Sequence, residues 1–480
     1  MTTKSLSPAR SIITPLIVAC ALFMEQLDGS IIATALPSIS RSLNTDPLHL
    51  NLAITSYMLS LAVFIPLSGW LADRLGARTI FRAAIIVFML GSIACGLSHD
   101  LLSLVLSRML QGAGGALMVP VGRLVLLRTV PKSQLVDAMA WVAAPAMIGP
   151  ILGPPLGGLI VTYASWEWIF YVNIPIGLLG LFLATRYVDN IKGRAREPLD
   201  QRGFFLMALC LGGLMFGFET LGRHLISDAI AGAFLLGGAI CFGLYLWHYK
   251  RIEHPIIDLS LLKYPTFRAS VLGGSLTRIA IGALPFLLPL TLQYGFGMNP
   301  ATSGLLTFAG AAGAILMKII ATQIIRTLRF RPVLLLNGFI NSFFIAGCAL
   351  LATTTPHSVI FIFLLIGGFF RSLQFTALNT IAFADIPSHL ISRANTFYNM
   401  MQQLTLSLGV AVGAMGLNIS LSLRGQDVLS AHDFWPVYVG LSLLPLLSLF
   451  SFLPLAANAG AEMSGHQVPA KESELKEPVP

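Results

Sequence analysis

Residues 68–82 read SGWLADRLGARTIFR, a charged turn that contains three arginines and one aspartate. The runs on either side of it, residues 49–72 and 80–98, are mostly apolar. Each is long enough to cross a bilayer, because an apolar helix needs about 20 residues to span about 30 Å of hydrocarbon. Two such runs joined by a short charged turn are typical of a chain that crosses a membrane repeatedly.

The composition extends this interpretation to the whole chain. Of the 480 residues, 55% are hydrophobic and only 11% are charged, whereas a soluble domain carries about 25% charged residues. A water-soluble protein is therefore excluded. The sequence contains no Walker P-loop, nucleophile elbow or HExxH motif, and its Cys and His residues show no metal-ligand spacing. We predict that the protein is not an enzyme and binds no metal or cofactor.

Fourteen runs are long and apolar enough to be membrane helices, and an all-α polytopic membrane protein is predicted. The runs are residues 12–35, 49–72, 80–98, 101–126, 136–161, 168–187, 203–221, 229–248, 268–292, 301–324, 332–353, 357–381, 395–420 and 434–456.

The basic residues predict the orientation of these helices. With the N-terminus inside, 23 of the 30 Lys and Arg residues fall on the inner side and three on the outer side, as the positive-inside rule requires. The net charge of +9 therefore reflects topology, with both termini cytoplasmic and no nucleic-acid partner. Four basic residues remain within the spans: Arg108, Arg278, Lys318 and Arg371.

The first run contains two carboxylates in FMEQLDGSIIATALP, residues 23–37. Glu25 and Asp28 are three residues apart and share one helix face. Two such carboxylates in a low-dielectric interior repel one another, so at least one of them is expected to bind and release a proton. The alternative is that one or both only hydrogen-bond to a neighbouring helix.

The turn quoted first is a candidate conformational gate. Gly69 and Gly76 allow a tight turn and close backbone approach, and Asp73 can face Arg74 or Arg78 across it. Such a turn can latch two helix ends in one conformation and release them in another. An ordinary charged loop is the alternative.

Two further runs carry unusual residues. Arg108 in LSRMLQGAGGALMVPVGR stays charged at membrane depth, so it needs a carboxylate, an anionic ligand or backbone carbonyls. The run APAMIGPILGPPLGGLI, residues 144–160, is dense in Gly and Pro, which in a membrane permits bends and tight helix contacts.

The second half of the chain suggests substrate contacts. Arg278 and Arg371 have no acidic neighbours in their helices, and Gln374 and Asn379 could add hydrogen bonds near Arg371. Several cations in one cavity would suit an anionic or carboxylate-rich substrate. The alternative is that Lys318 snorkels inward and Arg278 pairs with a helix end. Glu219 is expected at the outer interface.

Four ordered motifs make the chain resemble the major facilitator superfamily, within its fourteen-helix drug:proton antiporter branch and most of all its MdtD-type transporters. The first-helix pattern is matched by Leu27, Asp28, Ile31, Ala35, Leu36 and Pro37, with Ser30 in place of Thr. The gate pattern is matched by Gly69, Leu71, Ala72, Asp73, Arg74, Gly76 and Arg78. The fourth-helix pattern is matched by Leu104, Arg108, Gln111, Gly112 and Gly114. The antiporter pattern is matched by Gly149, Pro150, Gly153, Pro154, Gly157 and Gly158.

The resemblance implies a fold of two six-helix bundles, residues 12–187 and 268–456, related by a pseudo-twofold axis. Residues 188–267 would form a linker with an inserted helix pair, residues 1–11 a cytoplasmic N-terminus and residues 457–480 a disordered cytoplasmic tail. It also implies that Asp28 is the leading protonation site, with Arg108 on the proton path. Asp73, Arg74 and Arg78 would form the cytoplasmic gate, and the Gly/Pro run would favour export.

These observations support three hypotheses. The first is a proton-coupled exporter of small amphipathic or anionic molecules across a bacterial inner membrane, driven by the proton gradient. The second is a dedicated exporter of a carboxylate siderophore or an iron–citrate type of chelate. The third is a non-transporting membrane sensor or scaffold. The expected partners are the substrate, protons and the lipid bilayer, and we predict a monomer, leaving open a periplasmic adaptor.

Overall fold

The computed structural model describes residues 8–129, 135–188, 190, 199–220, 227–253, 255–387, 390–425 and 428–461. For residues 8–13, 127–129, 135–141 and 143–147 it describes the backbone alone. Most of the predicted tail lies outside these ranges. So do several basic residues that were used to predict the orientation, namely Lys4, Lys132, Lys192, Arg194, Arg196, Arg223, Lys471 and Lys476.

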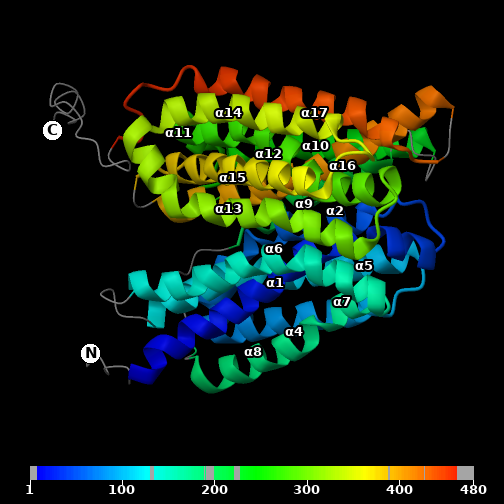
Figure 1. Cartoon of the computed structure of the whole chain (residues 1–480). Helices are drawn as coiled ribbons and strands as arrows, with labels where there is room; N and C mark the ends of the chain where they lie inside the picture. The colour runs from blue at the N-terminus through cyan, green and yellow to red at the C-terminus, as the bar shows by residue number, and fades with distance from the viewer. Residues whose placement is uncertain are drawn as a thin grey trace, which may run out of the picture.

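The described chain is a bundle of long helices in two halves, drawn from blue to blue-green and from green to red in Figure 1. The first half consists of α1 (Pro8–Ser42), α2 (Asn51–Phe64), α3 (Leu67–Leu75), α4 (Ala77–Gly96), α5 (Leu101–Thr129), α6 (Leu135–Tyr163), α7 (Trp168–Tyr171) and α8 (Asn173–Tyr187). The second half consists of α11 (Pro265–Arg268), α12 (Gly274–Leu290), α13 (Pro300–Leu328), α14 (Phe330–Gly347), α15 (His357–Ile381), α16 (Ile391–Arg424) and α17 (Ala431–Phe452).

Each of the fourteen predicted runs coincides with a helical segment. Twelve helices are long and apolar enough to cross a membrane, and the bent pair α2–α3 adds a thirteenth. The described side chains of α6 form a shorter apolar segment, Ile148–Tyr163. The predicted all-α polytopic fold is confirmed. Helix α1 begins and α17 ends on the same side of the bundle, which we call the terminal side, and the opposite side is the far side (Figure 1).

The second run is not one straight helix. It bends by 55° between α2 and α3, where Pro66 lacks a backbone N–H and restricts the residue before it. The bend separates α2 from the short α3, which contains the first half of the charged turn.

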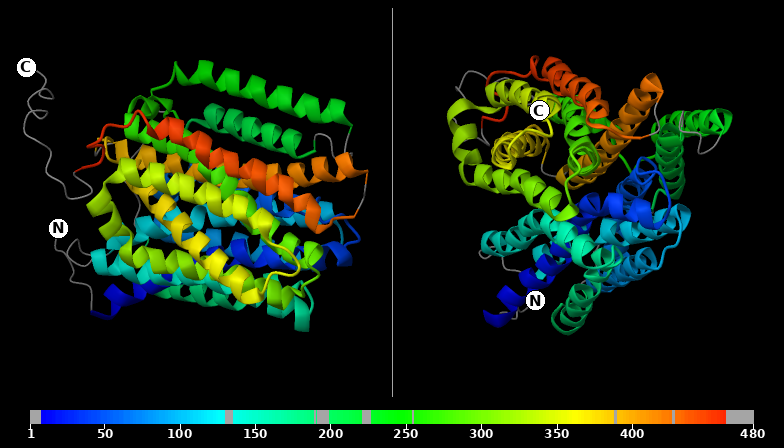
Figure 2. Two further views of the ribbon diagram at one scale, coloured as in Figure 1. Left: turned by 45° about the horizontal axis from the view of Figure 1, so that its top comes forward. Right: turned by 45° about the vertical axis from the view of Figure 1, so that its right-hand side comes forward.

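The inserted pair is α9 (Gln201–Thr220) and α10 (Asp228–Tyr249), which lies on the outside of the bundle in Figure 2. Helix α9 contacts α2 and α16, so the pair lies against one helix from each half. Glu219 is buried, and its Oε2 accepts a hydrogen bond of 2.8 Å from Asn51 Nδ2 of α2. The sequence predicted Glu219 at the outer membrane interface. In the structure its side chain is buried between α9 and α2 of the first half.

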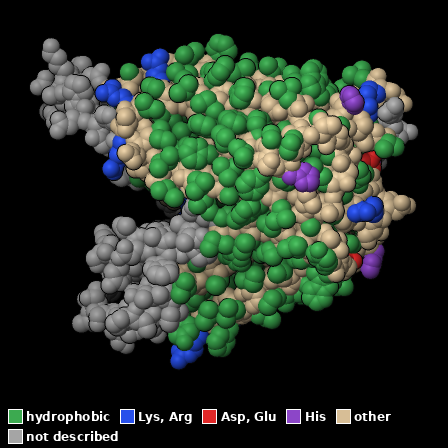
Figure 3. Space-filling model, viewed as in Figure 1, with side chains coloured by type: hydrophobic (Ala, Val, Ile, Leu, Met, Phe, Trp, Pro, Cys, Tyr) green, Lys and Arg blue, Asp and Glu red, His purple; other side chains and the backbone are tan. Residues whose placement is uncertain are grey.

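The surface is that of a membrane protein. Figure 3 shows hydrophobic side chains over the middle of the visible face, with Lys, Arg and His near its two ends. Large apolar side chains such as Leu236, Phe343 and Phe450 are more than half exposed, as expected for helices that face lipid. Residues 457–461, predicted to be disordered, turn back towards α14, where Gly460 lies against Phe330.

Candidate functional site

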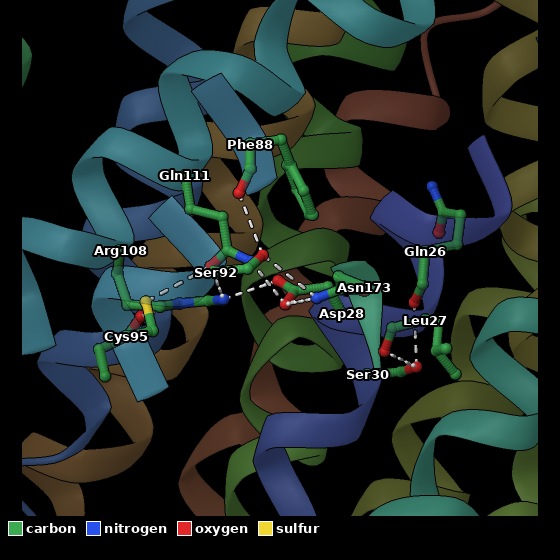
Figure 4. A network of polar contacts seen from close by, with 11 residues as sticks. Gln26, Leu27, Asp28, Ser30, Phe88, Ser92, Cys95, Arg108, Gln111 and Asn173 are labelled. Atoms are coloured by element: carbon green, nitrogen blue, oxygen red, sulfur yellow. Dashed lines mark hydrogen bonds and ion pairs between the residues drawn. The ribbon is translucent and has the colours of Figure 1, made fainter. Parts of the chain in front are cut away.

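Asp28 and Arg108 form a buried ion pair inside the first half (Figure 4). Arg108 Nη1 lies 2.6 Å from Asp28 Oδ2, and neither side chain is exposed. A lone charge at this depth would be expensive, so opposite charges at the same depth pair. This contact brings together two residues that the sequence predicted separately, one on α1 and one on α5.

A shell of amides surrounds the carboxylate. Gln111 Nε2 and Asn173 Nδ2 donate to Asp28 Oδ1 at 2.7 and 2.9 Å. Gln111 Nε2 also donates to Ser92 Oγ at 2.8 Å, and its Oε1 accepts from Arg108 Nη1 at 2.6 Å. The carboxylate therefore receives three hydrogen bonds, two from α5 and one from α8.

The guanidinium is held on its other side by α2. Arg108 Nε donates to the Ala53 carbonyl at 3.0 Å, and its Cζ lies 4.2 Å from the centroid of the Tyr57 ring. The Nη2 atom has no hydrogen-bond partner among the described residues. Arg108 thus links α1, α2 and α5.

The sequence of α5 explains this close assembly. A Cβ atom at Gly112 would lie 2.6 Å from the Tyr57 carbonyl oxygen, and one at Gly114 would lie 2.5 Å from the Phe88 nitrogen. Only glycine permits these approaches, which place Arg108 and Gln111 against α2 and α4.

At the far-side start of α5, hydrogen bonds from Ser103 hold the pKa of the exposed Asp100 carboxyl below its usual range.

A cavity of about 350 Å³ lies beside the ion pair, between the two halves. Its walls come from α1, α2 and α6 of the first half and from α12, α13, α15 and α16 of the second. Among the residues whose side chains are described, Glu25 and Arg371 are the charged ones that line it. Tyr57 also lines it, so one ring separates the cavity from Arg108.

The two halves meet on the far side of this cavity. Gln293 Nε2 of the second half donates to the Thr34 carbonyl of α1 at 3.0 Å. A Cβ atom at Gly304 of α13 would overlap the carbonyl oxygen of Pro154 on α6, and one at Gly158 would overlap that of Pro300. These contacts join the two halves on the far side of the cavity.

The protein comparisons agree with this architecture. The family model of the Major Facilitator Superfamily matches residues 18–410. A Salmonella typhi protein named for multidrug resistance, MdtD, is 41% identical over 406 residues, which cover 84% of this chain and 86% of the relative. The corresponding protein of Salmonella paratyphi A is 40% identical with the same coverage.

The chain belongs to the major facilitator superfamily.

Solved structures of low sequence identity share the superfamily fold. A D-xylose–proton symporter superposes with a TM-score of 0.67 at 14% identity, covering 95% of this chain and 99% of its own. A bacterial homologue of the human lysosomal transporter Spinster gives 0.58 at 15% identity, covering 97% and 100%. The predicted family is confirmed, and with it the similarity to MdtD-type proteins. The protein is a multi-pass membrane transporter and not an enzyme.

The motif predicted to form the gate lies on the terminal side, in α3 and the turn into α4. Gly76 has φ of 99°, a conformation that favours glycine. Among the described residues, neither Arg74 nor Arg78 forms an ion pair with Asp73. Arg78 Nη1 donates to the Val188 carbonyl at 3.4 Å, and Arg74 lies over the Trp70 ring. The turn is therefore attached to the segment after α8.

The antiporter motif of α6 packs along α1. A Cβ at Gly149 would lie 2.9 Å from the Leu27 nitrogen and one at Gly157 would lie 2.6 Å from the Ile31 carbonyl oxygen. A Cβ at Gly153 would overlap the Ser30 hydroxyl oxygen. Pro150 and Pro154 line the cavity. The motif thus connects the helix that carries Asp28 with the contact between the halves.

The predicted substrate residues are not brought together. Arg371 lines the cavity, whereas Arg278 is fully buried and donates to the Ser270 carbonyl at 3.2 Å and to the Tyr398 hydroxyl. Asn379 accepts a hydrogen bond from the same hydroxyl, and Gln374 accepts one from Asn337. Lys318 is exposed on α13 and is not among the cavity residues.

Sequence reasoning assigned no role to Gln111, although it belongs to a quoted motif, and it missed Asn173, Ser92 and Tyr57. Asn173 stands in the otherwise apolar segment WIFYVNIPIG. An amide in such a run is costly to bury without partners, and that cost is the signal that could have found it.

Proposed function

We propose that this transporter is a proton-coupled exporter of small amphipathic molecules in the bacterial inner membrane, with its terminal side facing the cytoplasm. The observation that supports this most is the buried Asp28–Arg108 pair with its amide shell. A carboxylate at membrane depth is a proton site by default, and here it is bound to a residue that connects three helices.

The pair explains how a proton could change the conformation. While Asp28 is ionised, it neutralises Arg108 and holds α1 against α5. A proton on the carboxylate removes that negative charge and leaves the buried guanidinium without a counter-charge, which destabilises this arrangement of the helices. The protonated and ionised forms therefore favour different packings, which is the requirement for proton binding to shift an alternating-access equilibrium.

The cavity supports the transport part of the proposal. It is lined by helices of both halves of a single chain, which supports a monomer as the transporting unit. The α6–α13 contact joins the halves on its far side, so rocking of the halves would exchange access between the two sides. The cavity adjoins the ion pair through Tyr57, which places cargo and proton site next to each other.

The same cavity favours amphipathic cargo over a carboxylate chelate. The chelate hypothesis rested on four basic residues within the spans. Of these, Arg371 alone lines the cavity, whereas Arg108 is already neutralised by Asp28. Apolar side chains such as Leu284, Leu288 and Val410 form much of the remaining wall.

The test is substrate-induced proton movement in proteoliposomes that contain a trapped pH-sensitive dye. Suitable probes are ethidium as an amphipathic cation, tryptophan as a zwitterion and N-acetyltryptophan as an anion. At least one probe should collapse an imposed pH gradient in the wild type. Asp28→Asn should abolish this collapse, yet still exchange labelled probe across the membrane when no gradient is present.

Asp433→Asn is the matched control, because Asp433 is also a buried carboxylate paired with an arginine, Arg424, but lies at the start of α17. It should keep wild-type coupling. The proposal fails if no probe moves protons, or if Asp28→Asn remains fully coupled.

A further inference from the structure

Two side chains of opposite charge face the central cavity from opposite halves. Glu25 comes from α1 and Arg371 from α15, and they are the charged members of the cavity lining. The Asp28–Arg108 pair next to them is already complete. The cavity therefore holds one negative and one positive group that are separate from the buried pair.

The Glu25 carboxylate has no hydrogen-bond partner within the described residues. The residue is 6% exposed, and its Oε2 atom is buried without a donor. The charged and titratable groups close enough to act on it are Arg123 of α5, Asp28 of α1 and Tyr57 of α2. No ion pair joins Glu25 to Arg123 in the described part of the chain. A carboxylate of this kind is open to a proton or to a ligand cation.

Arg371 likewise has no polar partner among the described residues. Neither a carboxylate nor any hydrogen-bond acceptor of the described chain pairs with its guanidinium. The group rests against α13, where a Cβ atom at Gly310 would lie 2.6 Å from Nη2. Glycine at that position leaves room for the guanidinium, which lines the cavity and also faces Cys348. Since Arg stays charged, it can bind an anionic group of a ligand.

The charges also restrict which ligand can drive antiport. Export driven by an inward proton requires that substrate binding and protonation oppose each other. In addition to the buried Asp28, Glu25 is a carboxylate that can take a proton, and it faces the cavity directly. A purely anionic ligand on Arg371 would bind better when Glu25 carries a proton, which is the wrong sign for competition. A ligand ammonium group on ionised Glu25 excludes the proton directly, but a purely cationic ligand leaves Arg371 without a partner. A molecule that carries both charges satisfies both groups.

We propose that the cavity binds an amphipathic zwitterion, with its ammonium group on Glu25, its carboxylate on Arg371 and its apolar body against Met58, Leu284 and Leu406. This inference rests on the proposed proton-coupled export and names its substrate class. The volume of about 350 Å³ admits a molecule of the size of an aromatic amino acid or a small dipeptide.

The test uses four probes that share one aromatic body. Tryptophan is the zwitterion, tryptophan amide the cation, N-acetyltryptophan the anion and N-acetyltryptophan amide the neutral compound. Binding to purified full-length protein in detergent is measured by isothermal titration at neutral pH. The wild type should bind tryptophan at least tenfold more tightly than any of the other three.

Variants of the two side chains test which charged group of the ligand each of them binds. Glu25→Gln should weaken tryptophan and tryptophan amide at least tenfold and bind N-acetyltryptophan at least as tightly as the wild type does, because it removes a negative charge from the cavity. Arg371→Gln should weaken tryptophan and N-acetyltryptophan and bind the amide at least as tightly as the wild type does, and Arg371→Lys should recover part of the loss. Glu219→Gln and Lys318→Gln are the controls, because neither residue is in the cavity lining, and both should bind all four probes like the wild type.

The outcomes separate this inference from the proposed function. Three results would overturn the assignment of a zwitterionic substrate. These are equal binding of the four probes, tightest binding of the anion or the cation, and variants that weaken the binding of all probes alike. If ethidium causes proton movement that depends on Asp28 while tryptophan does not bind, the assignment of a zwitterionic substrate is wrong and the proposal of proton coupling is supported. If tryptophan binds in the predicted pattern but no probe moves protons, the cavity assignment stands and proton coupling fails.

Discussion

Gly304→Ala should open the far side of the transporter. The added Cβ would lie 2.9 Å from the carbonyl carbon of Pro154 and overlap its oxygen, whereas ordinary van der Waals contact begins at 3.4 Å. Helices α6 and α13 must therefore separate by at least about half an ångström, or the backbone must distort. Overpacking of this kind costs about 1–3 kcal/mol, and the cost falls only on the conformation in which the halves touch.

That cost corresponds to a shift of about 5- to 150-fold in the equilibrium towards far-side-open states. Spin labels at positions 42 and 350 would report it, because Ser42 and Leu350 are exposed at the far-side ends of α1 and α14. Distances between the two spin labels are measured by double electron–electron resonance in a variant in which the five native cysteines are replaced. The long-distance population should grow in Gly304→Ala.

Gly440→Ala is the control, because a Cβ atom at Gly440 meets nothing within 4 Å. It should give the wild-type distance distribution. An unchanged distribution in Gly304→Ala, in protein that is folded and monodisperse, would refute the assignment of the α6–α13 contact as the far-side closure.

Three other substitutions test the packing of the charged groups. Gln111→Leu removes a donor to Asp28 and should cost about 1–3 kcal/mol, measured as a lower unfolding temperature in detergent, with impaired proton coupling. Unchanged stability would contradict the amide shell. Asp433→Asn weakens the capping box in which Ser430 is the N-cap residue, and it removes the charge that pairs with Arg424. Stability should therefore fall by about 0.5–2 kcal/mol while the transport rate per folded molecule stays constant. A loss of coupling would remove its value as a control. Glu219→Leu leaves the Asn51 amide without this acceptor and should cost about 1–3 kcal/mol, whereas Glu219→Gln keeps an acceptor and should be nearly neutral. Equal effects of the two variants would argue for packing alone.

The sequence was sufficient for the membrane helices, because a run of apolar residues of the required length has few other stable environments. It also predicted that Asp28 and Arg108 are significant, since a charge at membrane depth must find a partner. The two helices that carry them are neighbours in the fold, and pairing follows from their equal depth. What remained open was whether each acted alone.

Side-chain direction could not be predicted in the same way. Arg278 and Arg371 are both arginines deep in apolar helices, yet Arg371 faces the cavity and Arg278 faces Tyr398. Depth can be counted along a run, but the direction of a side chain depends on how each helix rotates against its neighbours. Gln374 shows the same limit, because its partner Asn337 belongs to another helix.

The Tyr57 ring lines the central cavity and also contacts Arg108 of the buried ion pair. The guanidinium carbon of Arg108 lies 4.2 Å from its ring centroid, so a bound molecule that touches the ring is separated from the ion pair by the thickness of one aromatic group. A compound wedged against this ring would immobilise the charge pair as well as fill the cavity. An inhibitor directed at a single side chain would thereby stop cargo binding and proton exchange together.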